Sequence, residues 1–181
     1  MSEGSVRYDV QPKGSVTDFN LKGRGLDNGR TKIALEEVLD AIAGMGAKPY
    51  FVFRAHPTEN AGDYAEYGSE IDRISCAGSA LELIYASDLV IGMTSTLLLE
   101  AVLLGKPCLA VLPDAGERAW LPGTESGVVP YATSREQVRL ELARLLVDDL
   151  RFLTAAGVPE VSVGAVQRSA DFVAARLQED P

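Results

Sequence analysis

Hydrophobic positions along the chain follow two alternating patterns. Short apolar runs rich in β-branched and aromatic residues predict buried strands, and longer segments with apolar residues three and four positions apart predict helices. Strands are predicted over residues 6–10, 49–54, 73–77, 88–93, 107–112 and 128–131. Helices are predicted over residues 31–43, 79–86, 94–104, 134–153 and 161–177. Apolar strands that alternate with helices indicate an α/β fold, a Rossmann-like parallel sheet flanked by helices.

The segment before the first long helix has a different pattern. Residues 12–30 contain four glycines and show little periodicity, which predicts a long loop. We therefore expect an amino-terminal strand and glycine-rich loop over residues 1–30 and a Rossmann-like domain over residues 31–181. The loop has neither GxGxxG nor GKS/T, so both a phosphate-binding loop and a flexible tail are compatible with it.

Composition narrows the possible partners. The 181 residues suit one domain, and the net charge of −9 argues against nucleic-acid binding by the chain as a whole. Residues 1–32 carry a net charge of +2, so this segment is a candidate wall for a bound anion. No apolar run is long enough to span a membrane, and the first residues lack the apolar core of a secretory signal. We therefore expect a cytoplasmic protein.

The cysteine and histidine content predicts no metal site. Cys76 and Cys108 both lie in apolar runs, which predicts two buried thiols in a reducing compartment. One histidine, His56, and two separated cysteines do not make a usual zinc site.

His56 follows the strand predicted over residues 49–54. Ligands of open parallel sheets bind beyond the carboxyl ends of the strands, which makes His56 a candidate phosphate donor or general acid–base group. The alternative is a polar residue satisfied at a strand end. Arg54 lies two residues earlier, and for this residue a structural ion pair is favoured over a ligand contact.

Three hydroxyl residues, Thr94, Ser95 and Thr96, follow the strand predicted over residues 88–93. Hydroxyls at a helix start can bind a phosphate or can simply cap the helix. Glu100 is one turn after Thr96 on the same face of the predicted helix. A lone carboxylate in an apolar helix is costly unless it is paired. Its partner is either a ligand, such as a ribose diol, or a buried arginine or backbone donor.

Three segments together resemble the carboxyl-terminal half of GT-B glycosyltransferases. They are RAHP at 54–57, ASDLVIGMTSTLLLEAVLLGKPCLAVLP at 86–113 and GERAW at 116–120. The resemblance covers roughly residues 31–178 and is closest to UDP-N-acetylglucosamine 2-epimerases and to surface- or capsule-polysaccharide transferases. Epimerases usually have Ser-Gly-Gly where this chain has Thr94-Ser95-Thr96, and an Asn where it has Thr58, which favours the transferase branch.

In that family this half binds the nucleotide of a sugar nucleotide. The resemblance implies a diphosphate held at Thr94, Ser95 and Thr96, with the ribose at Glu100. It implies a catalytic role for His56 near the phosphate or the sugar. Arg54, Glu117 and Arg118 are then possible substrate contacts.

The resemblance also implies the ligand and the partner. The ligand would be a nucleotide sugar linked to UDP or CDP, with no separate cofactor and no metal. Catalysis in GT-B enzymes needs a second domain, so a further domain or a partner chain is expected. Two other functions remain open: a non-catalytic nucleotide-binding regulatory module, and an epimerase-like isomerase domain.

Overall fold

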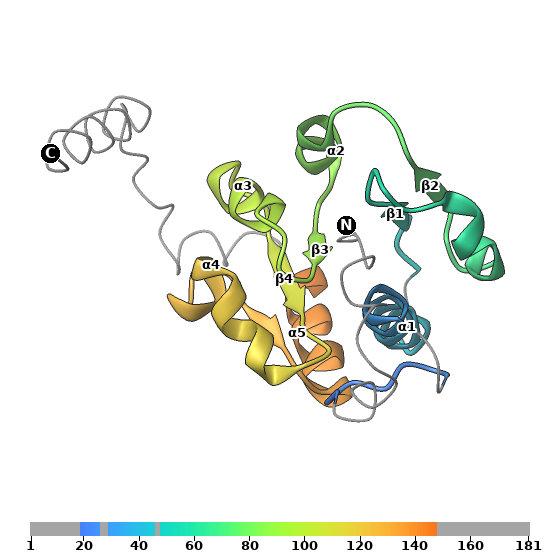
Figure 1. Ribbon diagram of the computed structural model, residues 1–181. Helices are drawn as coiled ribbons and strands as arrows, with labels where there is room; N and C mark the ends of the chain where they lie inside the picture. The colour runs from blue at the N-terminus through green and yellow to red at the C-terminus, as the bar shows by residue number, and fades with distance from the viewer. Residues whose placement is uncertain (1–18, 26–28, 46–47, 148–181) are drawn as a thin grey trace, which may run out of the picture.

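The computed structural model describes residues 19–25, 29–45 and 48–147 (Figure 1). The strand predicted over residues 6–10 and the helix predicted over residues 161–177 lie outside this part of the chain. The same holds for residues 148–153 of the predicted helix 134–153.

The described strands are all parallel and fall into two sheets. The strands are β1 (Val52–Arg54), β2 (Arg73–Ser75), β3 (Val90–Gly92), β4 (Cys108–Val111) and β5 (Tyr131–Ala132). β1 pairs with β2 in one sheet, and the order of the other is β3-β4-β5. The α/β class with parallel, Rossmann-like strands is thus confirmed. Among the described residues, β1 and β3 do not pair with each other.

Helices connect the strands. The α-helices are α1 (Arg30–Ala43), α2 (Ala80–Ala86), α3 (Leu97–Leu103), α4 (Pro122–Glu125) and α5 (Arg135–Val147). Two 3₁₀-helices, η3 (Ala61–Tyr67) and η4 (Ala115–Trp120), and the one-turn α4 are not predicted, because segments this short show no apolar periodicity. The helix predicted from residue 94 begins at Leu97, so the three hydroxyl residues precede it.

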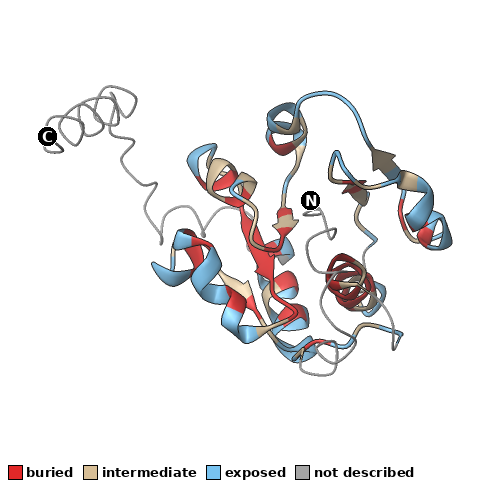
Figure 2. Ribbon diagram, in the orientation of Figure 1, coloured by how far each residue is buried: buried red, intermediate tan, exposed pale blue. Residues whose placement is uncertain are grey.

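The core lies on both faces of the β3-β4-β5 sheet. β4 is fully buried, and its side chains alternate between the two faces. Leu109 and Val111 pack with α1 and α5, whereas Cys108 and Ala110 pack with α2, α3 and the segment around α4. Figure 2 shows the buried residues concentrated on the strands and on the inner sides of these helices. The sheet is therefore covered by helices on each face.

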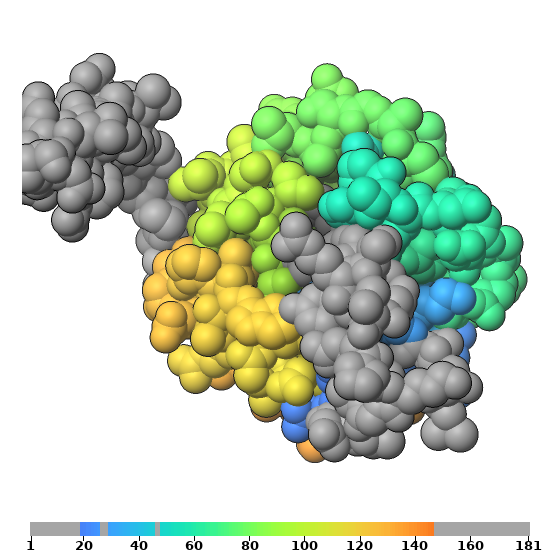
Figure 3. All heavy atoms as spheres, viewed as in Figure 1, coloured from blue at the N-terminus to red at the C-terminus, as the bar shows by residue number. Residues whose placement is uncertain are grey.

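A third apolar cluster joins α1 to β1. Leu35 and Leu39 of α1 pack with Phe53 of β1 and with Tyr64 and Tyr67 of η3. α1 thus contacts both sheets and connects them. On the outer surface, α2 and α3 lie side by side (Figure 3).

One expectation about burial is wrong. Cys76 is exposed, because it follows the end of the edge strand β2; Cys108 is buried as expected.

No helix in the described part of the chain is both long enough and apolar enough to cross a membrane.

Candidate functional site

The carboxyl ends of β3 and β4 lie at one edge of their sheet, because the two strands are parallel. Residues 93–96 follow β3, and residues 112–118 follow β4. The first residue of α1, Arg30, contacts both segments. The structure therefore brings Thr94 and Glu117 together through a residue that the sequence analysis did not place in the site.

Arg30 and Glu117 form a buried, bidentate ion pair. Arg30 Nε and Nη2 donate to Glu117 Oε1 and Oε2, each at 2.7 Å, and the two side chains are only 4% and 2% exposed. Arg30 Nη2 also donates to Thr94 Oγ1 at 3.1 Å. A planar guanidinium matches a carboxylate in this way, and a lysine does not. The pair joins α1, η4 and the segment after β3.

Neighbouring residues of η4 point in different directions. Glu117 is buried against Arg30, whereas Arg118 is exposed and lies over the ring of Tyr131, 5.2 Å from its centroid. Trp120 is half exposed, and the centroid of its ring lies 5.5 Å from the guanidinium carbon of Arg30. Glu117 and Arg118, both expected near a substrate, therefore have different surroundings: Glu117 orients Arg30, and Arg118 is accessible.

The hydroxyl residues after β3 have three different surroundings. Thr94 accepts the hydrogen bond from Arg30, and Ser95 Oγ accepts a hydrogen bond from the Leu97 amide at 3.3 Å. Thr96 occupies the N-cap position of α3, makes no side-chain capping bond and is exposed. Part of this triplet is thus engaged within the protein, as the capping alternative expects, and Thr96 is left exposed.

Glu100 lies in α3, one turn after Thr96, and is half-buried. Across the described residues its side chain makes neither a hydrogen bond nor an ion pair, and only its backbone groups are bonded, to Thr96 and Leu104. Among the described residues, neither a buried arginine nor a backbone donor contacts the Glu100 carboxylate as a structural acid would require.

His56 lies in a turn just beyond β1 and is half-buried. Its Nδ1 accepts a hydrogen bond from the Thr58 amide at 3.3 Å and lies 2.8 Å from Thr58 Oγ1. A neutral ring that accepts at Nδ1 carries its proton on Nε2. In the tautomer in which Nδ1 accepts from Thr58, the proton is on Nε2.

Glu59 fixes the backbone of this turn. Its Oε2 accepts from the His56 amide at 3.1 Å, and its Oε1 accepts from the Thr31 hydroxyl at 3.3 Å. Burial, followed by a hydrogen bond to Glu59, raises the pKa of Tyr64. Glu59 thus ties the turn to the first residues of α1, a role that no spacing in the sequence indicates.

Arg54 has a structural role. Its guanidinium donates to Ser75 Oγ at 3.1 Å and to the carbonyl oxygens of Ala77 and Gly78 at 2.8 and 2.7 Å. The sequence analysis favoured a structural ion pair, but the observed partners are a hydroxyl and carbonyls of the segment after β2.

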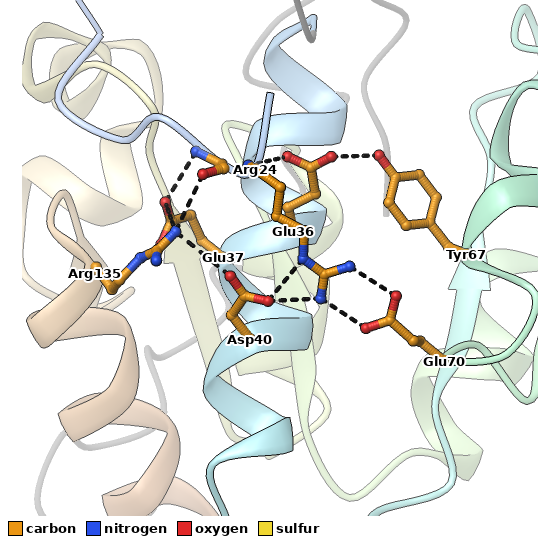
Figure 4. A network of polar contacts seen from close by, with 8 residues as sticks. Arg24, Glu36, Glu37, Asp40, Tyr67, Glu70 and Arg135 are labelled. Carbon is orange, nitrogen blue, oxygen red and sulfur yellow. Dashed lines mark hydrogen bonds and ion pairs between the residues drawn. The ribbon is translucent and has the colours of Figure 1, made fainter. Parts of the chain in front are cut away.

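Glu36, a buried carboxylate of α1, holds the loop that precedes this helix (Figure 4). Its Oε2 accepts from the Arg24 amide at 2.6 Å, and its Oε1 accepts from the Tyr67 hydroxyl at 2.6 Å. Burial, followed by this bond, raises the pKa of Tyr67.

Glu37, the next residue of α1, binds the same loop and α5. Its Oε1 accepts from the Gly23 amide at 3.0 Å, and its Oε2 accepts from Arg135 Nε at 2.7 Å. This bond raises the pKa of Arg135. Two adjacent acids thus compensate their burial by binding consecutive amides of one loop, which stays against α1.

Three cations of the segment 1–32 that the structure describes pair with acids of the protein. Arg24 pairs with Asp40 and Glu70, and its hydrogen bonds lower the pKa of Glu70. Arg30 pairs with Glu117, and Lys32 pairs with Glu66 at 2.6 Å. The charges of Arg24, Arg30 and Lys32 are therefore compensated within the protein.

Among the described residues, no three histidine, cysteine, aspartate or glutamate side chains are grouped so that they could hold a metal ion. No protein-family model, curated protein or solved structure matches the chain.

Proposed function

We propose that this chain is the sugar-nucleotide-binding domain of a GT-B-like glycosyltransferase that acts in the cytoplasm in surface- or capsule-polysaccharide synthesis. The nucleotide sugar, linked to UDP or CDP, would bind at the carboxyl ends of β3 and β4. Glu100 would accept hydrogen bonds from the ribose, and the diphosphate would lie near Ser95 and Thr96. A second domain or partner chain would supply the acceptor side.

The observation that carries this proposal is the environment of the Glu100 carboxylate. Its carboxylate is half-buried, follows the hydroxyl residues by one turn and has no side-chain partner among the described residues. A diol supplies two donors at a spacing that suits one carboxylate. The resemblance of residues 86–113 to the nucleotide-binding half of GT-B enzymes supports the same role.

His56 would serve as the donor to phosphate or sugar. Thr58 contacts the ring at Nδ1, and in the tautomer in which Nδ1 accepts, Nε2 carries the proton that an anionic oxygen would accept. The Arg30–Glu117 pair would keep Thr94 in place and would not itself contact the ligand.

A thermal-shift panel of UDP, CDP, GDP and their sugars tests the proposal. A ligand at 100 times its Kd stabilises a folded protein by about 2.7 kcal/mol. This gain corresponds to a rise in Tm of roughly 5–10 °C for a chain of this size. We expect at least one nucleoside diphosphate to raise the Tm and to shift the NMR signals of Thr94, Ser95 and Thr96. Flat melting curves across the whole panel, with folded protein, would contradict nucleotide binding.

A sugar-transfer assay distinguishes the non-catalytic regulatory module from the glycosyltransferase domain. Both bind a nucleotide, but only the enzyme half gains sugar transfer when a cognate second domain is added. We expect the chain alone to transfer no sugar, since the acceptor side is supplied elsewhere in GT-B enzymes. Robust turnover by the purified chain would contradict this division of roles.

A further inference from the structure

The two halves of the candidate site follow strands of different sheets. His56 lies just beyond β1, and Thr94 follows β3. Among the described residues these two strands do not pair with each other, so no ladder between them sets the position of His56 relative to Thr94. A ligand that meets both residues therefore needs another contact to hold the two halves in place.

The first turn of α1 contacts both halves. Arg30 Nη2 donates to Thr94 Oγ1 at 3.1 Å, and the hydroxyl of the next residue, Thr31, donates to Glu59 Oε1 at 3.3 Å. Arg30 and Thr31 are each only 5% exposed. Adjacent residues of one helix have a fixed spacing. Thr94 and Glu59 are therefore both held to the same rigid turn.

Glu59 extends this connection to His56. Its Oε2 accepts from the His56 amide at 3.1 Å, so one carboxylate joins the buried Thr31 hydroxyl to the backbone of the candidate donor. The Glu59 amide donates to the His56 carbonyl at 2.9 Å. The backbone that carries the imidazole is thus fixed both at its amide and at its carbonyl.

A buried tyrosine supports the same carboxylate. The Tyr64 hydroxyl is hydrogen-bonded to Glu59, and Tyr64 is only 4% exposed. The centroid of its ring lies 4.5 Å from that of Phe53 in β1. The Glu59 carboxylate therefore rests on the apolar cluster that also holds β1, and is not a freely solvated acid of the turn.

The start of η3 does not require Glu59. The N-cap of this helix is Asn60, whose Oδ1 accepts from the Gly62 amide at 2.9 Å and whose carbonyl accepts from the Asp63 amide at 3.0 Å. The contacts of the Glu59 carboxylate go to α1, to Tyr64 and to His56 instead. They serve the position of the turn and not the capping of a helix.

The two halves also border one cavity. Thr31, Phe53 of β1 and Met93, the residue before Thr94, line the same space under α1. Phe53 precedes His56 by three positions. The connection through α1 therefore spans two segments that lie close to each other.

We propose that Glu59 is a positioning residue that, through Thr31, holds His56 where its imidazole can donate to the phosphates of a nucleotide bound after β3. This inference rests on the proposed function, which supplies the nucleotide. It adds two residues, Glu59 and Thr31, that act on the ligand only through His56.

NMR titration with UDP and with uridine tests the proposal, because only UDP carries phosphates. Glu59→Gln keeps the size of the side chain but offers one acceptor oxygen in place of two. We expect it to weaken UDP binding about 10-fold and uridine binding by less than about 2-fold. If the thermal-shift panel selects CDP, then CDP and cytidine replace this pair. Equal losses for the nucleotide and the nucleoside would overturn the proposal.

Thr31→Val tests the same connection from its other end. It removes the hydroxyl that donates to Glu59 and keeps the shape of the side chain, so the result does not depend on the folding of one variant. We expect the same selective loss of UDP affinity. Asp63→Asn, an exposed acid of η3, controls for the loss of one negative charge and should leave UDP affinity unchanged.

A double-mutant cycle shows whether Glu59 acts through His56. His56→Ala should weaken UDP binding about 10-fold or more. In this background Glu59→Gln should cost less than a further factor of about 2, because the group that it positions is gone. Losses that multiply in the double variant would overturn the positioning role, since a structural effect of Glu59 does not depend on the imidazole.

A measurement without ligand separates this inference from the proposed function. We expect the ¹⁵N order parameter of the His56 amide to fall from about 0.85 in wild type to below about 0.6 in Glu59→Gln and Thr31→Val. This fall in a wild-type protein that binds no nucleotide of the panel would contradict the proposed function alone. An equally ordered His56 in both variants would overturn the positioning role of Glu59, whatever the protein binds.

Discussion

Two acids near the carboxyl ends of the strands differ in what compensates their charge. Glu117 is 2% exposed and receives two hydrogen bonds from Arg30, while Glu100 is half-buried and has no side-chain partner in the described residues. Burial without a partner is costly for an ion, so a conservative change should have opposite effects at the two positions.

Glu117→Gln is expected to destabilise the fold. The amide keeps the shape but leaves the Arg30 charge buried and uncompensated, which costs about 3–5 kcal/mol. Urea unfolding followed by circular dichroism measures the loss. Arg30→Met combined with Glu117→Leu should recover most of it, because an apolar pair of similar volume replaces two ions.

Arg118→Met is the matched control for this experiment, since Arg118 is the exposed neighbour in η4. We expect its free energy of unfolding to stay within about 0.5 kcal/mol of wild type. A Glu117→Gln protein as stable as this control would show that the buried pair contributes little to the fold.

Glu100→Gln is expected to keep or raise the stability without ligand, because it neutralises an unpaired acid. Nucleotide affinity should fall about 10-fold or more, since a charge-assisted hydrogen bond contributes roughly 1.5–3 kcal/mol. Isothermal titration with the nucleotide found in the thermal-shift panel measures this change. A 2′-deoxy nucleotide should bind wild type less tightly and lose little further affinity in the variant.

Glu82→Gln, an exposed acid of α2, controls for the loss of one negative charge. It should leave both stability and affinity unchanged. A Glu100→Gln protein that melts early yet keeps its nucleotide affinity would make Glu100 a structural acid instead of a ribose ligand.

At the level of elements, local patterns predict the long segments and fail for the short ones. α1 follows from its apolar spacing, and β4 from a continuous apolar run, because burial acts along the whole element. η3 and η4 depend on single capping contacts instead: Asn60 and Asp114 accept from the amides of Gly62 and Gly116. Such contacts leave little periodicity in the sequence.

The loop before α1 is an element whose conformation depends on one glycine. Gly23 has a φ of +59°, and a β-carbon added there would overlap the Glu36 carboxylate that binds the Arg24 amide. Gly127 has a similar φ of +80°, but an added β-carbon would meet no atom within 4 Å. An alanine at either position would be strained by the positive φ. Only the alanine at position 23 would also overlap the Glu36 carboxylate.

Gly127→Ala should cost about 1–2 kcal/mol, the strain of a left-handed conformation for an L-residue. Gly23→Ala should cost a further 1–3 kcal/mol or so, because the loop amide also loses its carboxylate acceptor. Urea unfolding compares the totals, and hydrogen exchange at Arg24 reports the freed amide. Equal losses in the two variants would mean that Glu36 does not hold the loop.

At the scale of the whole molecule, the sequence predicts the fold class but not which residues meet. The helix–strand alternation is enough for a parallel α/β architecture. Arg30 and Glu117, however, are 87 positions apart, and no spacing rule connects them. The Thr94 hydroxyl accepts a hydrogen bond from Arg30, a partner that the sequence analysis did not predict. The periodicity of apolar residues indicates which residues are buried. Which side chains contact each other across the sheet depends on the order of its strands.

The rates at which the two cysteine thiols react can measure how often the whole molecule unfolds. Cys108 lies on β4 in the centre of its sheet, fully buried, and burial raises the pKa of its thiol to about 12. The thiolate is the reactive form, so Cys108 is protected both by burial and by its protonation. Cys76 is exposed just beyond β2.

We expect a disulfide reagent at pH 8 to modify Cys76 rapidly and Cys108 only when the sheet opens. Core strands open with nearly the full free energy of unfolding, so the two rates should differ by at least about 1,000-fold. Cys76→Ser removes the fast phase and leaves the slow one, which urea should accelerate in step with the loss of circular dichroism. Labelling of Cys108 at a rate insensitive to urea would mean that β4 opens locally, and that this strand is not the centre around which the two faces of the sheet are packed.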